Sequence, residues 1–94
     1  MKYILIATRD PNEPPEKFEP HMDEEANMAL KLYKDGIFRE LYSRGDGKGA
    51  MAVVEANSEK EVMEHVSKLP FVKLNLLKIE IFEAVPYRGF IRGL

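Results

Sequence analysis

One carboxylate, Glu25, stands out in this 94-residue chain because it falls on the apolar side of a predicted helix. The segment from Asp23 to Asp35 has apolar residues at helical spacing, about 100° per residue, so that they form one broad arc. Glu25 projects into that arc, between Ala29 and Leu32. A carboxylate held against apolar surface either finds a cation or has a raised pKa. A raised pKa suits a group that transfers protons near neutral pH.

Two interpretations of Glu25 are open on this pattern. In the first, Glu25 is a general base. In the second, it forms a structural ion pair, or its stem lies along the apolar arc while its head reaches water. His21 precedes Glu25 by four residues, so the two side chains can meet if the helix begins that early. His21 then orients Glu25 or acts as a second acid or base; otherwise it is only a residue at the helix start.

Arg39 is the cation that could hold an anionic substrate group, because its planar guanidinium suits a carboxylate. In an extended strand Arg39 shares a face with Ile37 and Leu41, so its head group is expected at an apolar boundary. The alternative is an ion pair with Glu25 or Glu40. A direct pair with Glu25 would lower the pKa of the glutamate and weaken it as a base.

Other kinds of site find little support in the sequence. There is no cysteine, and therefore no disulfide, thiolate nucleophile or Cys-based metal site. The two histidines, His21 and His65, lack a His-x-x-x-His spacing, so we expect no metal and no cofactor. The glycine-rich stretch 45–49 lacks the Gly-Lys-Ser/Thr sequence of a phosphate-binding loop, and we interpret it as a hairpin turn.

Length and charge narrow the class of protein further. Ninety-four residues fit one domain, 1–94, in which 85–94 is a C-terminal tail. The net charge of −2, with scattered Lys and Arg, gives no electrostatic case for nucleic acid or an anionic membrane. The N-terminal apolar run is too short for a signal peptide or a membrane span. We therefore expect a cytoplasmic protein, which fits the absence of cysteine.

The predicted order of elements is βαββαβ, which is typical of a ferredoxin-like α+β fold with two helices on one face of a four-stranded antiparallel sheet. Strands are expected at 2–8, 37–44, 50–56 and 72–84. Between the first strand and the first helix lies a loop from Pro11 to Pro20, whose prolines exclude regular structure. Gly36 is expected to end the first helix. Ser58 and Glu61 match a capping box that opens the second helix, which Pro70 ends.

Both faces of the first strand are apolar, with Leu5 on one side and Ile4 and Ile6 on the other. Two helices cover only one face of such a sheet, and the other face would expose more apolar surface than soluble monomers usually do. We therefore expect two sheets to pair face to face across a two-fold axis, as a homodimer or a higher assembly. The tail, 86–94, either docks on a neighbour, rims a pocket or is a loosely ordered terminus.

The stretch from the first helix to the last strand resembles the muconolactone delta-isomerase family. The resemblance rests on Gly-Ile-Phe-Arg-Glu-Leu-Tyr at 36–42, similar to a Gly-x-aromatic-Arg-x-Leu-aromatic signature, on the run 53–58, and on Leu-Pro-Phe at 69–71. Aligned on Gly36, Glu25 falls where family members also place a glutamate in the first helix. Phe38 and Tyr42 stand where the family has tryptophans, and the proline-rich loop and the arginine-containing tail depart from its pattern.

The resemblance implies a small α/β-barrel protein, paired through its sheets, that shifts a carbon–carbon double bond in an unsaturated lactone carboxylate without a cofactor. This reaction needs a base, a donor or cation for the developing enolate, and a partner for the substrate carboxylate. Glu25 and His21 are then the catalytic candidates, and Arg39, Tyr42 and Phe38 the substrate-binding ones. Because folds of this kind host many chemistries, the alternative is a small-ligand-binding or oligomerising protein without catalysis.

Overall fold

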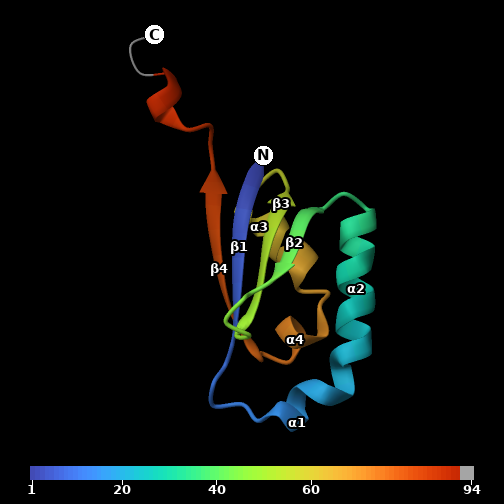
Figure 1. The fold of residues 1–94 in the computed structure, drawn as a ribbon. Coiled ribbons are helices and arrows are strands. Elements are labelled where there is room, and N and C mark those ends of the chain that lie inside the picture. The colour runs from blue at the N-terminus through green and yellow to red at the C-terminus, as the bar shows by residue number, and fades with distance from the viewer. Residues whose placement is uncertain (92–94) are drawn as a thin grey trace.

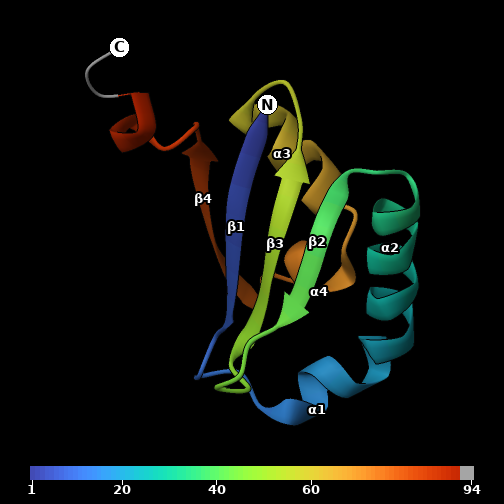
Figure 2. The same cartoon turned by 45° about the horizontal axis from the view of Figure 1, so that its top comes forward.

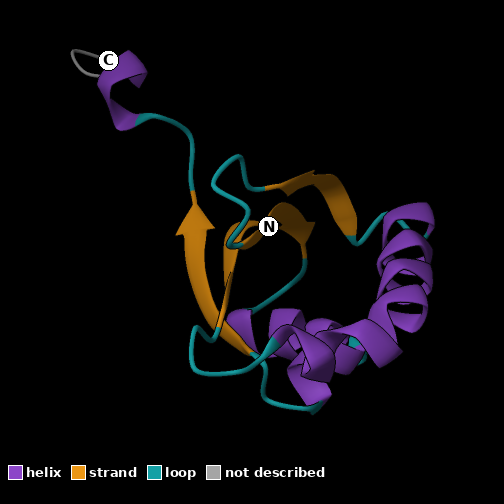
Figure 3. Ribbon diagram, turned by 60° about the horizontal axis from the view of Figure 1, so that its bottom comes forward, coloured by secondary structure: helices purple, strands orange, loops and turns teal. Residues whose placement is uncertain are grey.

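The computed structural model describes residues 1–91 and confirms a four-stranded antiparallel sheet with helices on one face (Figure 1). Its strands are β1 (Lys2–Arg9), β2 (Phe38–Ser43), β3 (Gly49–Glu55) and β4 (Leu77–Ala84), in the order β2-β3-β1-β4. The long helices are α2 (Met22–Lys34) and α3 (Glu59–Val66). Figure 3 shows these two and the shorter helices between the strands gathered on one side of the sheet, with only the C-terminal turn standing apart. This is the ferredoxin-like arrangement that the sequence predicts.

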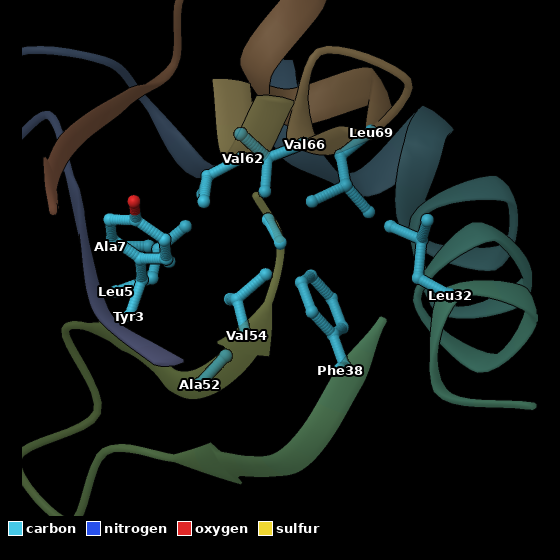
Figure 4. Packing of buried hydrophobic residues seen from close by; sticks show 11 residues of the cluster. Tyr3, Leu5, Ala7, Leu32, Phe38, Ala52, Val54, Val62, Val66 and Leu69 are labelled. Carbon is cyan, nitrogen blue, oxygen red and sulfur yellow. The ribbon is translucent and has the colours of Figure 1, made fainter. Parts of the chain in front are cut away.

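The main core lies between the helices and the inner face of the sheet, where side chains from both layers converge (Figure 4). Strand alternation places every second residue of β1 inward. Opposite them, α3 buries Val62 and Val66 completely, as the helical spacing predicts. The buried cluster consists of Tyr3, Leu5, Ala7, Leu32, Phe38, Ala52, Val54, Ala56, Val62, Val66 and Leu69.

The predicted end of the first helix, the predicted start of the second and the hairpin turn are present, whereas α3 ends at Val66 and not at Pro70. Gly36 follows α2 with φ +78°, a conformation that glycine adopts without strain. The Ser58 side chain accepts a hydrogen bond from the backbone N–H of Glu61 at 3.1 Å and so caps α3. The Glu61 carboxylate accepts from the N–H of Asn57, at 3.1 Å, one residue before the partner that a capping box uses. The turn between β2 and β3 contains the glycine-rich stretch.

Two proline-containing segments differ from the prediction, because proline begins a helix in each. The loop predicted to lack regular structure contains α1 (Pro15–Phe18) and the 3-10 turn η1 (Glu19–His21). Part of the predicted last strand is instead α4 (Pro70–Lys73), so β4 begins only at Leu77. At the first position of a helix the missing N–H of proline costs nothing and its fixed φ is already helical.

A β-bulge in β2 changes the position of Arg39. The pairing of β2 with β3 shifts between Phe38 and Glu40, so Arg39 is an extra residue in the strand. Leu41 pairs with Ala52, which faces inward, whereas Arg39 has no Cα partner on β3, because its two neighbours pair with consecutive residues of that strand. The prediction that Arg39 shares a face with Leu41 is therefore wrong, because strict alternation fails at the bulge.

The outer face of the sheet and the C-terminal segment leave large apolar side chains exposed. Phe82 on β4 is 51% exposed and Met51 on β3 is 39% exposed. After β4 the chain leaves the sheet and forms the turn η2 (Arg88–Ile91), which projects beyond the body of the molecule (Figure 2). The rest of the predicted tail, 92–94, lies outside the described residues. No helix within 1–91 is both long and apolar enough to cross a membrane.

Candidate active site

A cavity of about 590 Å³ lies between the inner face of the sheet and the helices. All four strands form one wall, and α2, α3 and α4 contribute the other. Small side chains leave this space open, because the inward positions here are alanines: Ala7, Ala50 and Ala52 on the sheet, and Ala26 and Ala29 on α2. A largely apolar cavity of this size suits a small organic molecule.

Glu25 lies on the cavity wall, in the first turns of α2, and is half-buried. Its Oε1 accepts a hydrogen bond from the backbone N–H of Phe71 at 2.8 Å. Burial raises the pKa of the Glu25 carboxyl, and the Phe71 hydrogen bond opposes that rise. Within residues 1–91 Glu25 forms no ion pair. The carboxyl is therefore placed in an apolar cavity without a neighbouring cation to neutralise it.

The other predicted site residues divide into two groups. Phe38 and Tyr42 contribute to the cavity wall, whereas His21 and Arg39 are not among its lining residues. His21 ends η1 and is the N-cap residue of α2, four residues before Glu25, and the two side chains form no hydrogen bond or ion pair within residues 1–91. Arg39 is displaced from the cavity by the bulge in β2.

Tyr42 borders the cavity, but its hydroxyl is engaged on the other side of the sheet. The phenol donates a hydrogen bond to Oε1 of Glu40 at 2.7 Å. This bond to a carboxylate raises the pKa of Tyr42. Tyr42 and Glu40 pair with Met51 and Val53, which face outward, so the 54% exposed phenol does not point into the cavity.

Two arginines that the sequence did not single out, Arg9 and Arg44, also line the cavity. The Arg44 guanidinium donates from Nη1 to Oγ1 of Thr8 at 2.7 Å and from Nη2 to Oδ2 of Asp46 at 2.6 Å. Its charge is therefore balanced by Asp46. Arg9 has its guanidinium carbon 5.1 Å from the centre of the Phe18 ring, and forms no ion pair in the described part of the chain. Arg9 is thus the cation on this wall that remains available to an anion.

Strand register explains why Arg9 lies beside the hairpin turn. Its backbone N–H donates to the Lys48 carbonyl at 2.8 Å, which extends the β1–β3 ladder past the pair of Thr8 and Gly49. Gly49 permits this close approach: it has φ +156°, and a Cβ there would lie 1.9 Å from the carbonyl oxygen of Ala7. The residue types alone do not predict that Arg9 lies beside the hairpin turn, because this contact depends on the register of the sheet.

The site therefore offers one carboxyl, one available guanidinium and extensive apolar surface. Within residues 1–91 no group of three or more His, Asp or Glu side chains is arranged to hold a metal ion. A carboxyl of raised pKa can accept a proton from carbon and return it, while a guanidinium stabilises the negative charge that develops. The arrangement is suited to proton transfer on a small anionic molecule.

Solved structures share this fold, among them an isomerase and a dehydrochlorinase. Muconolactone isomerase superposes with a TM-score of 0.75 at 19% sequence identity, covering 93% of this chain and 91% of that one. A 5-chloro-2-hydroxyhydroquinone dehydrochlorinase from Burkholderia phenoliruptrix AC1100, in complex with 2,5-dihydroxybenzoquinone, superposes with a TM-score of 0.66 at 18% identity, covering 95% and 98%. No protein-family model and no curated protein matches the sequence. The chain has a muconolactone isomerase-like fold, and identities this low establish the fold alone.

Proposed function

We propose that this protein is a cofactor-independent enzyme that moves a proton on a small unsaturated lactone or carboxylate, with Glu25 as the base. The observation that carries the proposal is a half-buried carboxyl on the wall of an apolar cavity, unpaired with any cation in the described chain. Burial raises its pKa and brings it closer to neutral pH, where a general acid–base group works best.

The proposed reaction moves a proton from one carbon of the substrate to another. Glu25 removes a proton from a carbon next to the double bond, the double bond moves, and the protonated Glu25, which exchanges its proton with the solvent, gives a proton to the far carbon. The electron pair stays within the substrate throughout, so no other reactant is needed. The negative charge of the intermediate and of a substrate carboxylate is stabilised by Arg9, which replaces Arg39 as the anion-binding residue. We leave His21 out of this proposal, because it is not among the residues that line the cavity.

The fold neighbours support a reaction of this class. One is an isomerase named for a lactone, and the other is a dehydrochlorinase solved with a dihydroxybenzoquinone. Both names concern small ring compounds. The cavity described above, with apolar walls from Leu5, Phe38 and Leu77, has room for a molecule of that size.

A proton-exchange experiment tests this proposal. Unsaturated lactones are incubated with the protein in deuterated water, and deuterium uptake at carbon is followed by NMR. We expect Glu25→Gln to lower the exchange rate by about 10²–10⁴-fold while the lactone still binds. Glu24→Gln is the matched control, since Glu24 is exposed on the same helical turn, and it should exchange at the wild-type rate.

Two results would contradict the proposal. Exchange at the wild-type rate in Glu25→Gln would show that Glu25 is not the base. If the wild-type protein bound lactones but catalysed no exchange at all, it would be a ligand-binding protein on the same scaffold and not an enzyme.

We further propose that two copies of the chain pair through the outer face of the sheet. The outward-facing positions of β1, β3 and β4 form an apolar face that no other element within residues 1–91 covers; its side chains are Ile4, Ile6, Met51, Val53 and Phe82. Phe82→Asp should convert the assembly to monomers, as measured by analytical ultracentrifugation. A wild-type protein that sediments as a monomer would contradict this pairing.

A further inference from the structure

We propose that Phe71 and Phe18 are positioning residues that fix where Glu25 and Arg9 stand relative to each other, and so determine how an anionic ring is held between them. The inference rests on the proposed function. Four residues form one continuous series of contacts, Glu25 to Phe71, Phe71 to Phe18, and Phe18 to Arg9. One end of the series is the proposed base, and the other is the available cation on the same cavity wall.

The first contact is made by the backbone of Phe71. Phe71 is the second residue of α4, after Pro70, which has no N–H, and no side chain of the preceding Leu69 caps the helix. Glu25 supplies that missing acceptor through Oε1, at 2.8 Å. The bond holds one carboxyl oxygen in place. Its other oxygen, Oε2, has no hydrogen-bond partner within residues 1–91, and we assign it the proton transfer.

The second and third contacts are made by aromatic rings. Phe71 packs edge-to-face on Phe18, with ring centres 5.1 Å apart and planes at 85°. The Phe18 ring in turn lies 5.1 Å from the guanidinium carbon of Arg9, a cation–π contact. Both phenylalanines are almost fully buried, at 4% and 5% exposed, and form a small cluster with Leu76 apart from the main core. Burial on this scale keeps the rings in place.

The two ends of this series respond to different changes, which makes the inference testable. Removing the Phe18 ring releases Arg9 but leaves the Phe71 amide on Glu25. Removing the Phe71 N–H releases Glu25 but leaves both rings. A merely structural cluster would affect stability in both cases without this separation.

The first experiment changes Phe18. Benzoate, a ring with one carboxylate, is the binding probe, and the substrate found by proton exchange is used for the kinetics. We expect Phe18→Leu to weaken benzoate binding about two- to fivefold and to raise KM similarly, with kcat and the Glu25 titration unchanged. Phe18→Tyr keeps the ring and should restore wild-type binding. Unchanged benzoate affinity in a folded Phe18→Leu protein would overturn this part of the inference.

The second experiment removes a single hydrogen-bond donor, the backbone N–H of Phe71. The 94-residue chain can be made by chemical synthesis with the hydroxy acid of phenylalanine at position 71, which keeps the ring and replaces the N–H by an ester oxygen. We expect the pKa of Glu25, followed by carbon-13 NMR, to rise, because the lost hydrogen bond lowers it, and the pH profile of kcat to move upward with it. Phe71→Leu keeps the N–H and should leave the Glu25 titration unchanged.

The native chain provides a check that needs no folded variant. The Phe71 amide resonance should shift with the same midpoint as the Glu25 carboxyl. An amide that does not follow this titration, or an ester chain with an unaltered Glu25 pKa, would overturn the inference. Failure of the proposed function looks different: no exchange or turnover occurs, while the benzoate and titration results still follow the pattern above.

Discussion

The two ends of the layer between sheet and helices differ in one respect, the size of the inward side chains. At one end, the packed end, β1 and β3 pair Tyr3 with Val54, and both are buried. At the other, the cavity end, the same strands pair Ala7 with Ala50. The pairing of β1 with β3 and the alternation of their side chains are the same at both ends. The comparison shows that side-chain volume along two strands decides where the core stops and the cavity begins.

Helix α2 repeats this difference along its length. Leu32 near its C-terminal end is 1% exposed and fills the packed end, whereas Ala29, one turn earlier, lines the cavity. Glu25 follows one further turn toward the N-terminus. A half-buried carboxyl is tolerated there because the cavity end is not filled with apolar side chains that would exclude all water from it.

The largest stability effect should come from changing the size of the inward side chains on α2. Leu32→Ala opens a void at the packed end and should cost about 2–5 kcal/mol of the free energy of unfolding. Ala29→Leu occupies space that is already empty, so it should change stability by about 1 kcal/mol or less while abolishing ligand binding. Urea unfolding and benzoate titration measure both quantities. Equal destabilisation by the two variants would remove the distinction between the ends.

A smaller effect should appear where the backbone itself packs closely at the cavity end. Gly49→Ala forces a Cβ against the Ala7 carbonyl and should cost about 1–3 kcal/mol. Gly45→Ala, in the same hairpin turn, has no atom within 4 Å of the new Cβ and is the matched control. Thermal unfolding compares the two. If both variants were as stable as wild type, the turn would not be held against β1 as described.

The smallest effect is a pH dependence of stability that arises from Glu25. Because burial raises its pKa above the ordinary value of 4.5, the folded chain binds more protons than the unfolded one between the two pKa values. The stability contributed by this group is therefore complete below 4.5 and is lost as pH rises through the folded pKa. In Glu25→Gln this loss should be absent, whereas Glu24→Gln should retain it. Urea unfolding across that pH range supplies the measurement.

Much of the fold could be predicted from the sequence, because strand alternation, helical periodicity and helix caps are local patterns. Two of the errors, the missed short helices, have a common cause in the chemistry of proline. Pro15 and Pro70 were expected to exclude or end helices, but each stands at the first position of one, where proline is favoured. These two short helices carry Phe18 and Phe71, so the cluster beside the site was also missed.

The candidate site was only partly predictable for a different reason. Glu25 could be found because helical periodicity marks an acidic residue on an apolar face. The anion-binding residue could not, because the bulge that exposes Arg39 and the register that brings Arg9 to the cavity are properties of the assembled sheet. Pairing between distant strands depends on packing that no short stretch of sequence contains.

The central claim is that the Glu25 carboxyl lies in an apolar cavity and is poised for proton transfer. A carbon-13 NMR titration of the Glu25 side chain in the wild-type protein tests it most directly. The account predicts a midpoint above the ordinary glutamate value of 4.5, because desolvation outweighs the Phe71 hydrogen bond. A midpoint at or below 4.5 would show a carboxylate that is well solvated or neutralised, and would contradict its role as the base.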